Sequence, residues 1–132
     1  MTIILIRATA WILLAIIVAL TLVPPAFRPV TSMPHIVEHA LIFLLTGAVF
    51  ALAYEIRASF FFAAAMIFSG CLEGLQSVVP GRHARLSDAV VDALSACIGI
   101  AIAILGLRLQ QRKMRFYPAR SERDKSGQRG RF

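Results

Sequence analysis

Carboxylate and amide side chains inside two apolar segments are the groups best suited to chemistry in this sequence. Glu73 and Gln76 are three residues apart, and Asp88 and Asp92 are four apart, so each pair would share one face of a helix. An ionised carboxylate inside an apolar membrane helix costs about 2.5–3.5 kcal/mol. Carboxylates are retained in membrane helices when they are paired, hydrated or needed for function. We expect a functional role chiefly for Glu73 and Asp92. For Asp88, which follows Ser87, the alternative is a purely structural role as a cap at the start of its helix.

A histidine motif offers a second kind of chemistry. The string HIVEH, from His35 to His39, matches the inverted zinc-protease signature H-x-x-E-H. Both histidines could bind Zn²⁺ with Glu38 as general base and Glu73 or Asp92 as a third ligand. A proline directly precedes the motif, and Glu38 lies about 100° from His39 around a helix, so interfacial histidines are the favoured interpretation. We expect no metal and no cofactor, with zinc at His35 and His39 as the alternative.

The composition defines the environment in which these residues act. Of the 132 residues, 58% are hydrophobic and 16% are charged, whereas soluble domains are about 45–50% apolar and about 25% charged. A soluble fold of this size cannot bury so much apolar surface. The composition excludes a disordered chain, a disulfide-stapled secreted domain and a conventional soluble enzyme. It predicts a polytopic membrane protein.

Four apolar segments are long enough to cross a hydrocarbon core of about 30 Å. The expected spans are about residues 3–23, 36–54, 58–79 and 87–107. The predicted fold is all-α, with four transmembrane helices packed in a compact bundle over residues 1–107. Residues 108–132 form a basic tail that we expect to be mobile. A cleaved signal peptide is disfavoured, because no small-residue cleavage site follows the first segment.

The charge distribution predicts an orientation. The formal net charge of +7 resides in the tail, where nine basic and two acidic residues follow residue 107. Basic residues mark the cytoplasmic side, so an even number of spans predicts both termini in the cytoplasm (N-in/C-in). We expect the tail to contact anionic lipid headgroups rather than nucleic acid. This topology places one polar cluster at the outer membrane face: His39, Glu73, Gln76, Arg82, Asp88 and Asp92.

Small residues in the third and fourth segments indicate close helix packing. Gly70 and Gly74 form a G-x-x-x-G pair, and Ser95, Gly99 and Ala103 recur every fourth residue. Such stripes let helix backbones approach closely. We expect both to serve packing within the bundle rather than dimerisation.

Two strings between residues 33 and 106 resemble the VanZ-like family of small integral membrane proteins. They are HALIFLLTGAVFALAY and LEGLQSVVPGRHARLSDAVVDALSACIGI. The family has a histidine opening an apolar helix, an acid followed three residues later by glutamine, a Pro-Gly-Arg turn, and an aspartate followed four residues later by asparagine. The corresponding residues here are His39, Glu73, Gln76, Arg82, Asp88 and Asp92. The chain departs from the pattern in having Asp92 for the asparagine, and His35 and Ile36 where an Asp-Lys pair is usual.

The resemblance implies a multi-pass protein of the bacterial inner membrane with a role in the cell envelope. The family is associated with resistance to teicoplanin-type glycopeptide antibiotics, and some members with envelope polysaccharide. No enzymatic activity is firmly attached to it. A catalytic residue is therefore not implied by the resemblance.

The polar cluster indicates what kind of molecule would bind. The guanidinium of Arg82 is planar and permanently charged, which suits a phosphate or a carboxylate. We expect binding of an anionic lipid or of a lipid-linked glycan headgroup, including a polyisoprenoid-linked precursor. One alternative is a membrane-embedded hydrolase that uses Glu73 or Asp92 with His39. Another is a structural subunit of an envelope complex.

Overall fold

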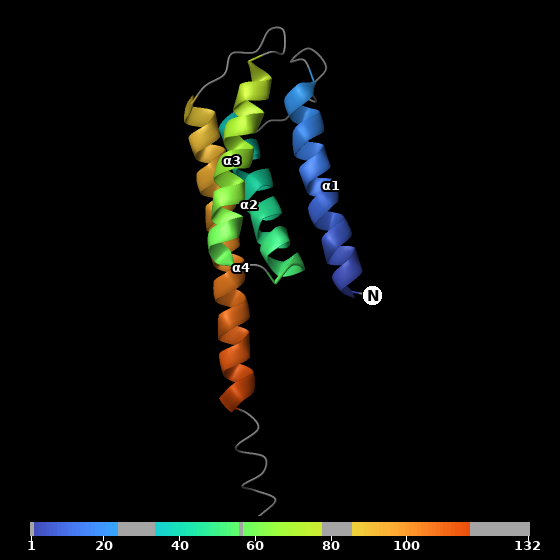
Figure 1. The fold of residues 1–132 in the computed structure, drawn as a ribbon, viewed down its shortest axis with the longest axis vertical. Coiled ribbons are helices and arrows are strands. Elements are labelled where there is room, and N and C mark those ends of the chain that lie inside the picture. The colour runs from blue at the N-terminus through green and yellow to red at the C-terminus, as the bar shows by residue number, and fades with distance from the viewer. Residues whose placement is uncertain (1, 24–33, 56, 78–85, 117–132) are drawn as a thin grey trace, which may run out of the picture.

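The computed structural model describes residues 2–23, 34–55, 57–77 and 86–116 (Figure 1). Four helices make up this part of the chain: α1 (Thr2–Leu22), α2 (His35–Ala53), α3 (Ala58–Gln76) and α4 (Leu86–Phe116). All four are long and apolar enough to cross a membrane. The prediction of an all-α bundle of four apolar helices is confirmed for these residues.

Local sequence explains where the helices begin and end. In hydrocarbon every backbone amide must be hydrogen-bonded within the segment, which makes long apolar runs helical. The first helix ends at Leu22, shortly before Pro24 and Pro25 in the sequence, and proline cannot continue a helix. Pro34 stands at the N-cap of α2, and its carbonyl accepts hydrogen bonds from the amides of Val37 and Glu38.

The helices alternate in direction, so α2 and α4 run parallel to each other (Figure 1). The contact between these two is the most extensive in the bundle, and α3 packs mainly on α4. The first helix packs on α2 and barely touches α3. The extensive contacts therefore link the helices in the order α1, α2, α4 and α3, and α3 makes few contacts with either α1 or α2.

Two glycines allow the parallel helices to approach closely. A β-carbon added at Gly47 of α2 would collide with the carbonyl oxygen of Ala96, and one at Gly99 of α4 would collide with the carbonyl oxygen of Leu44. The stripe predicted in the fourth segment therefore does serve internal packing, with Ser95 and Ala103 also buried.

The glycine pair of the third segment behaves differently. Gly70 and Gly74 lie on the exposed side of α3, and an added β-carbon would meet no atom within 4 Å at either position. The expectation that this pair packs inside the bundle is wrong. The physical reason is that the buried face of α3 is occupied instead by Phe61, Ser69 and Leu72.

An aromatic cluster fastens α1 to the end of α2. The indole Nε1 of Trp11 donates a hydrogen bond to the Tyr54 hydroxyl at 2.8 Å. Arg7 donates from Nε to the carbonyl oxygen of Ala53 at 3.2 Å, and its guanidinium lies 5.0 Å from the centre of the Tyr54 ring. These contacts satisfy the arginine inside an otherwise apolar helix.

The fourth helix is longer than the span expected for it. It continues past residue 107 to Phe116, for 31 residues in total, which corresponds to about 46 Å. Its last turns project beyond the other helices (Figure 1) and carry exposed Arg108, Arg112 and Lys113. The first part of the expected tail is thus helical, and residues 117–132 lie outside the described part of the chain.

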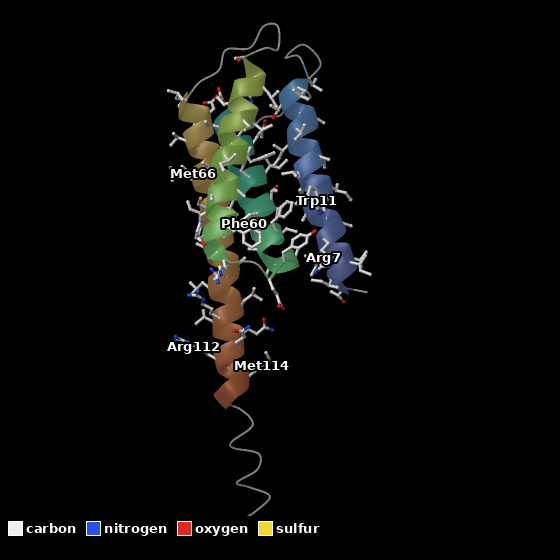
Figure 2. All side chains as sticks on the ribbon, viewed as in Figure 1. Arg7, Trp11, Phe60, Met66, Arg112 and Met114 are labelled. Carbon is white, nitrogen blue, oxygen red and sulfur yellow. The ribbon has the colours of Figure 1, made fainter. Side chains whose placement is uncertain are left out.

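Large apolar side chains cover the outside of the bundle. Phe60, Met66 and Trp11 are all more than half exposed, and Figure 2 shows apolar side chains along the outside of all four helices. A monomeric soluble protein rarely exposes such continuous apolar surface. Together with the four candidate spans, this surface identifies a multi-pass membrane protein.

Replacement of Gly99 by alanine should weaken the α2–α4 contact. The new methyl group would overlap the backbone of Leu44, and forced overpacking typically costs about 1–3 kcal/mol. We expect a lower free energy of unfolding for Gly99→Ala in detergent, measured by titration with a denaturing detergent. Gly74→Ala is the matched control and should be neutral, because open space surrounds Gly74. Equal effects of the two substitutions would contradict this packing.

Candidate functional site

A histidine and an aspartate from the two parallel helices face each other near one end of the bundle. The Nδ1 atom of His39 lies 3.3 Å from both carboxylate oxygens of Asp92. Both side chains are largely shielded, with 13% of His39 and 5% of Asp92 exposed. The close approach of α2 and α4 brings together two residues that are 53 positions apart in the sequence.

The imidazole of His39 is oriented by its surroundings. On α2, the ring of Phe43 lies one turn further along and stacks with it, with centroids 6.3 Å apart and planes inclined by 17°. Phe43 is itself buried in an apolar cluster with Ile17, Leu72 and Ala96. A packed aromatic wall and a carboxylate therefore fix the plane of the imidazole and direct Nδ1 towards α4.

The third helix contributes three buried polar residues to the same end of the bundle. Ser69, Glu73 and Gln76 follow one another at helical spacing, and they are 2%, 6% and 7% exposed. They lie on the side of α3 that packs into the bundle. Among the acidic residues that the structure describes, Glu73 and Asp92 are the two that are buried.

The depth of these groups follows from their positions in the helices. Glu73 is three residues before the end of α3, His39 four residues after the start of α2, and Asp92 six residues after the start of α4. At about 1.5 Å per residue, they lie roughly 5–9 Å below the helix ends. The cluster is thus below the surface but within reach of the aqueous side.

Asp88 takes part in a different contact. It lies in the first turn of α4 and is half-buried, and its Oδ1 accepts a hydrogen bond from the Ser87 hydroxyl at 3.0 Å. This local interaction at the helix start is separate from the buried pair formed by Asp92. The structure therefore places Asp88 above the cluster, at its rim.

Two predicted residues fall outside what can be described. Arg82 belongs to residues 78–85, which lie outside the described part of the chain, and the side chain of His35 is likewise not described. The zinc hypothesis for His35 and His39 therefore stays a prediction. Among the described side chains, no three from histidine, cysteine, aspartate and glutamate gather in an arrangement that could hold a metal ion.

Sequence reasoning missed Ser69 as a polar member of the cluster and treated Ser95 only as a packing residue. Both are buried, and the Ser69 hydroxyl has no hydrogen-bond partner among the described residues. The signal was present in the spacing, since Ser69 precedes Glu73 by one turn and Ser95 follows Asp92 by three residues. One buried oxygen of Glu38 also lacks a partner within the described ranges.

This arrangement can bind hydroxyl and amino groups. Carboxylates accept hydrogen bonds, an amide both donates and accepts, and an imidazole does either according to its tautomer. Hydrogen bonds of this kind are stronger in a site shielded from water than on an exposed surface. A polar headgroup that reached this depth would find several partners at once.

Comparison with known proteins adds no relative. No protein-family model matches the chain, and searches of curated proteins and of solved structures find no match. The resemblance to VanZ-like proteins therefore stays a prediction from the two sequence strings. Function has to be inferred from the buried cluster itself.

A double-mutant cycle should detect coupling between His39 and Asp92. We expect His39→Ala and Asp92→Ala, alone and together, to give a coupling free energy between about 0.6 and 1.7 kcal/mol, as polar pairs in membrane bundles do. Unfolding by a denaturing detergent would measure it. The control cycle pairs His39 with Asp88, which is engaged by Ser87, and should give a value near zero. Equal coupling in both cycles would refute a specific pair.

Proposed function

We propose that this protein is a VanZ-like component of the bacterial inner membrane that binds an anionic lipid or lipid-linked glycan by its headgroup at the outer face. The observation that carries the proposal is that buried polar side chains of α3 and α4 and the largely shielded His39 of α2 lie at one end of an apolar bundle. Side chains of this kind are costly inside a membrane and mark sites of function. A link to glycopeptide resistance or envelope polysaccharide is part of the same proposal.

The chemistry of a headgroup fits the residue types available. In the sequence, Arg82 lies between α3 and α4, four residues before the first residue of α4. A guanidinium there would bind phosphate or carboxylate in bidentate fashion. Within the described bundle, Glu73, Gln76 and Asp92 offer acceptors to sugar hydroxyls. A phosphorylated glycan carries both an anionic group for the guanidinium and hydroxyl groups for these acceptors.

The proposed orientation places the cluster on the outer side. The start of α1 and the end of α4 lie at the opposite end of the bundle from the cluster (Figure 1). Exposed Arg108, Arg112 and Lys113 project there from α4. Basic residues next to a membrane span favour the cytoplasm, which supports cytoplasmic termini and an outward-facing cluster.

The test of this proposal is lipid retention by an arginine variant. The full chain, released gently from its own membrane, should carry an anionic lipid or polyisoprenoid carrier in native mass spectrometry. We expect Arg82→Ala to lower the retained fraction at least tenfold, because loss of a hydrogen bond to a charged group costs about 1.5–3 kcal/mol. Arg28→Ala is the matched control. In the sequence, Arg28 lies between α1 and α2, just as Arg82 lies between α3 and α4.

Each result of this experiment has a definite meaning. Retention that is equal in Arg82→Ala and the unmodified protein would refute headgroup binding through Arg82. A lipid-free protein that is found with a second polypeptide, and whose abundance falls with every cluster substitution, would favour a structural subunit of an envelope complex. A stoichiometric zinc ion lost in His39→Ala would favour the zinc alternative.

The His39–Asp92 contact gives specific support to a second candidate function. A carboxylate on Nδ1 orients an imidazole for proton transfer, as in many hydrolases. In this alternative, the protein cleaves a bond in the bound lipid, and Glu73 or Asp92 acts with His39.

Substitution of Glu73 separates catalysis from electrostatic binding. If Glu73 transfers a proton, Glu73→Gln should slow release of product from a lipid extract by at least 100-fold, as loss of a general base does. Lipid retention should persist in that variant. Glu73→Asp is the control that keeps the charge. If Glu73→Gln retains lipid and releases product at the rate of the unmodified protein, the hydrolase alternative with Glu73 as base fails. Product analysis by mass spectrometry in lipid nanodiscs measures the rate.

A further inference from the structure

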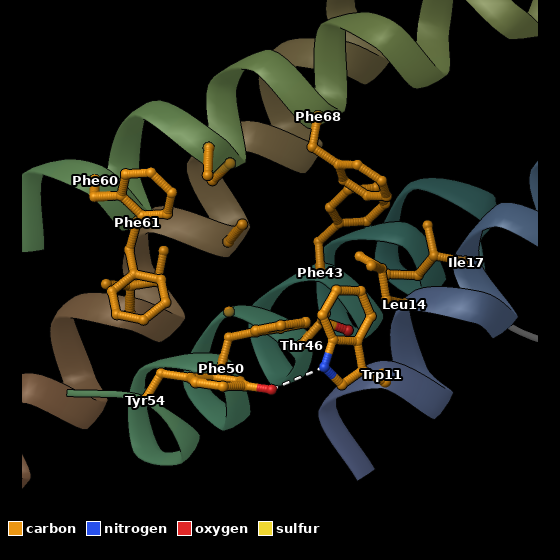
Figure 3. A pocket seen from close by; sticks show the side chains of 15 residues that line it. Trp11, Leu14, Ile17, Phe43, Thr46, Phe50, Tyr54, Phe60, Phe61 and Phe68 are labelled. Carbon is orange, nitrogen blue, oxygen red and sulfur yellow. Dashed lines mark hydrogen bonds between the residues drawn. The ribbon is translucent and has the colours of Figure 1, made fainter. Parts of the chain in front are cut away.

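An apolar cavity of about 360 Å³ occupies the other half of the bundle (Figure 3). Helices α1, α2 and α3 supply most of its lining, with Ala96 and Ile100 from α4. Aromatic rings line it at both ends, from Phe43 and Phe68 at one end to Phe50 at the other (Figure 3). None of the polar-cluster residues lines this cavity.

The cavity opens sideways out of the bundle. Trp11 of α1 and Ala64 of α3 line it and are nevertheless exposed. This opening exists because α1 packs on α2 and barely touches α3. Around a multi-pass protein, the medium beyond such an opening is the hydrocarbon of the bilayer.

The two ends of the cavity differ in character. At one end, the indole N–H of Trp11 donates its hydrogen bond to the Tyr54 hydroxyl (Figure 3). At the other end, Phe43 lines the cavity and also stacks on His39. From Phe43 to Tyr54 the cavity follows about 16 Å of α2, at 1.5 Å per residue. The cavity and the polar cluster thus share Phe43 as a common wall.

The size and lining of the cavity select its occupant. Apolar cavities do not hold water, because water needs two to four polar partners. A transmembrane helix is about 10 Å across, which is too wide for a space of 360 Å³. An unfilled space would forfeit dispersion contacts along its whole lining. A single hydrocarbon chain is narrow enough to enter from the bilayer and restores those contacts.

We propose that the cavity holds one hydrocarbon chain of the membrane lipid whose headgroup lies at the polar cluster. The proposal rests on the proposed function for the headgroup, and on the cavity for the chain. The protein would then recognise a lipid at two places, by polar groups near the outer face and by an aromatic channel at the depth of the chains. The chain, rather than the headgroup alone, would decide how long the lipid stays bound.

A matched pair of substitutions on α3 tests the proposal. Ala64→Phe places a ring into the cavity, whereas Ala63→Phe adds the same ring at an exposed neighbour that does not line it. In native mass spectrometry of the full chain released from its own membrane, we expect Ala64→Phe to retain at least fivefold less lipid than the unmodified protein. Ala63→Phe should stay within twofold. Equal retention in both variants would overturn the proposal.

A measurement on the unmodified protein covers the case in which Ala64→Phe does not fold. Trp11 is the only tryptophan in the sequence and lines the cavity, so its fluorescence reports on the occupant. A phosphatidylglycerol, an anionic lipid, with brominated acyl chains and titrated into the delipidated protein in detergent, should quench Trp11 saturably at about one lipid per protein chain. Quenching that rises without saturation indicates only bulk partitioning and would overturn the proposal.

The outcomes separate this inference from the proposed function. Saturable quenching and an effect of Ala64→Phe, with no effect of Arg82→Ala on retention, would support the chain site and refute the headgroup site. Lipid retention that depends on Arg82 but not on Ala64, without saturable quenching, would support the headgroup site and refute the chain site. A lipid-free dimer whose dissociation is promoted by Ala64→Phe would also overturn the chain site, because a second copy would then fill it.

Discussion

The close approach of two parallel helices is the constraint on which the rest of this structure depends. Gly47 and Gly99 each stand where any side chain would collide with the backbone of the other helix. Without that approach, the 3.3 Å contact between His39 and Asp92 could not form, since it requires short side chains to meet across the helix pair. In a membrane, where apolar burial does not drive helices together, such backbone proximity is a principal source of packing energy.

The bundle divides its length between two kinds of interior. Towards one end the interior includes polar side chains, with Glu73 and Gln76 of α3 and Asp92 of α4 buried and His39 of α2 largely shielded beside them. Towards the other end the interior is an apolar cavity, which is bordered by α1 and has the hydrogen-bonded Trp11 and Tyr54 in its lining. Phe43 stands at the boundary and contacts both. A molecule with a polar head and an apolar chain matches this order from the end inwards, which a small soluble ligand does not.

Sequence patterns predicted the elements better than their relative orientation. Long apolar runs have one structural solution in hydrocarbon, so the four helices followed from composition and length. Spacing also grouped Glu73 with Gln76 on one face of α3. It could not tell which face of α3 meets its neighbours, because Gly70 and Gly74 carry the same small-residue signal as Gly99 yet face outwards. Pairing of His39 with Asp92 depends on the rotation of two helices, which neither helix encodes alone.

The parallel course of α2 and α4 has a consequence for biosynthesis. Parallel helices cannot be joined by a hairpin, so α3 must be made and inserted between them. During synthesis His39 therefore resides in the membrane before its partner Asp92 exists. Both residues lie within about two helical turns of the helix ends, where water can solvate them in the meantime. The His39–Asp92 pair can therefore form only after α4 has been synthesised and inserted.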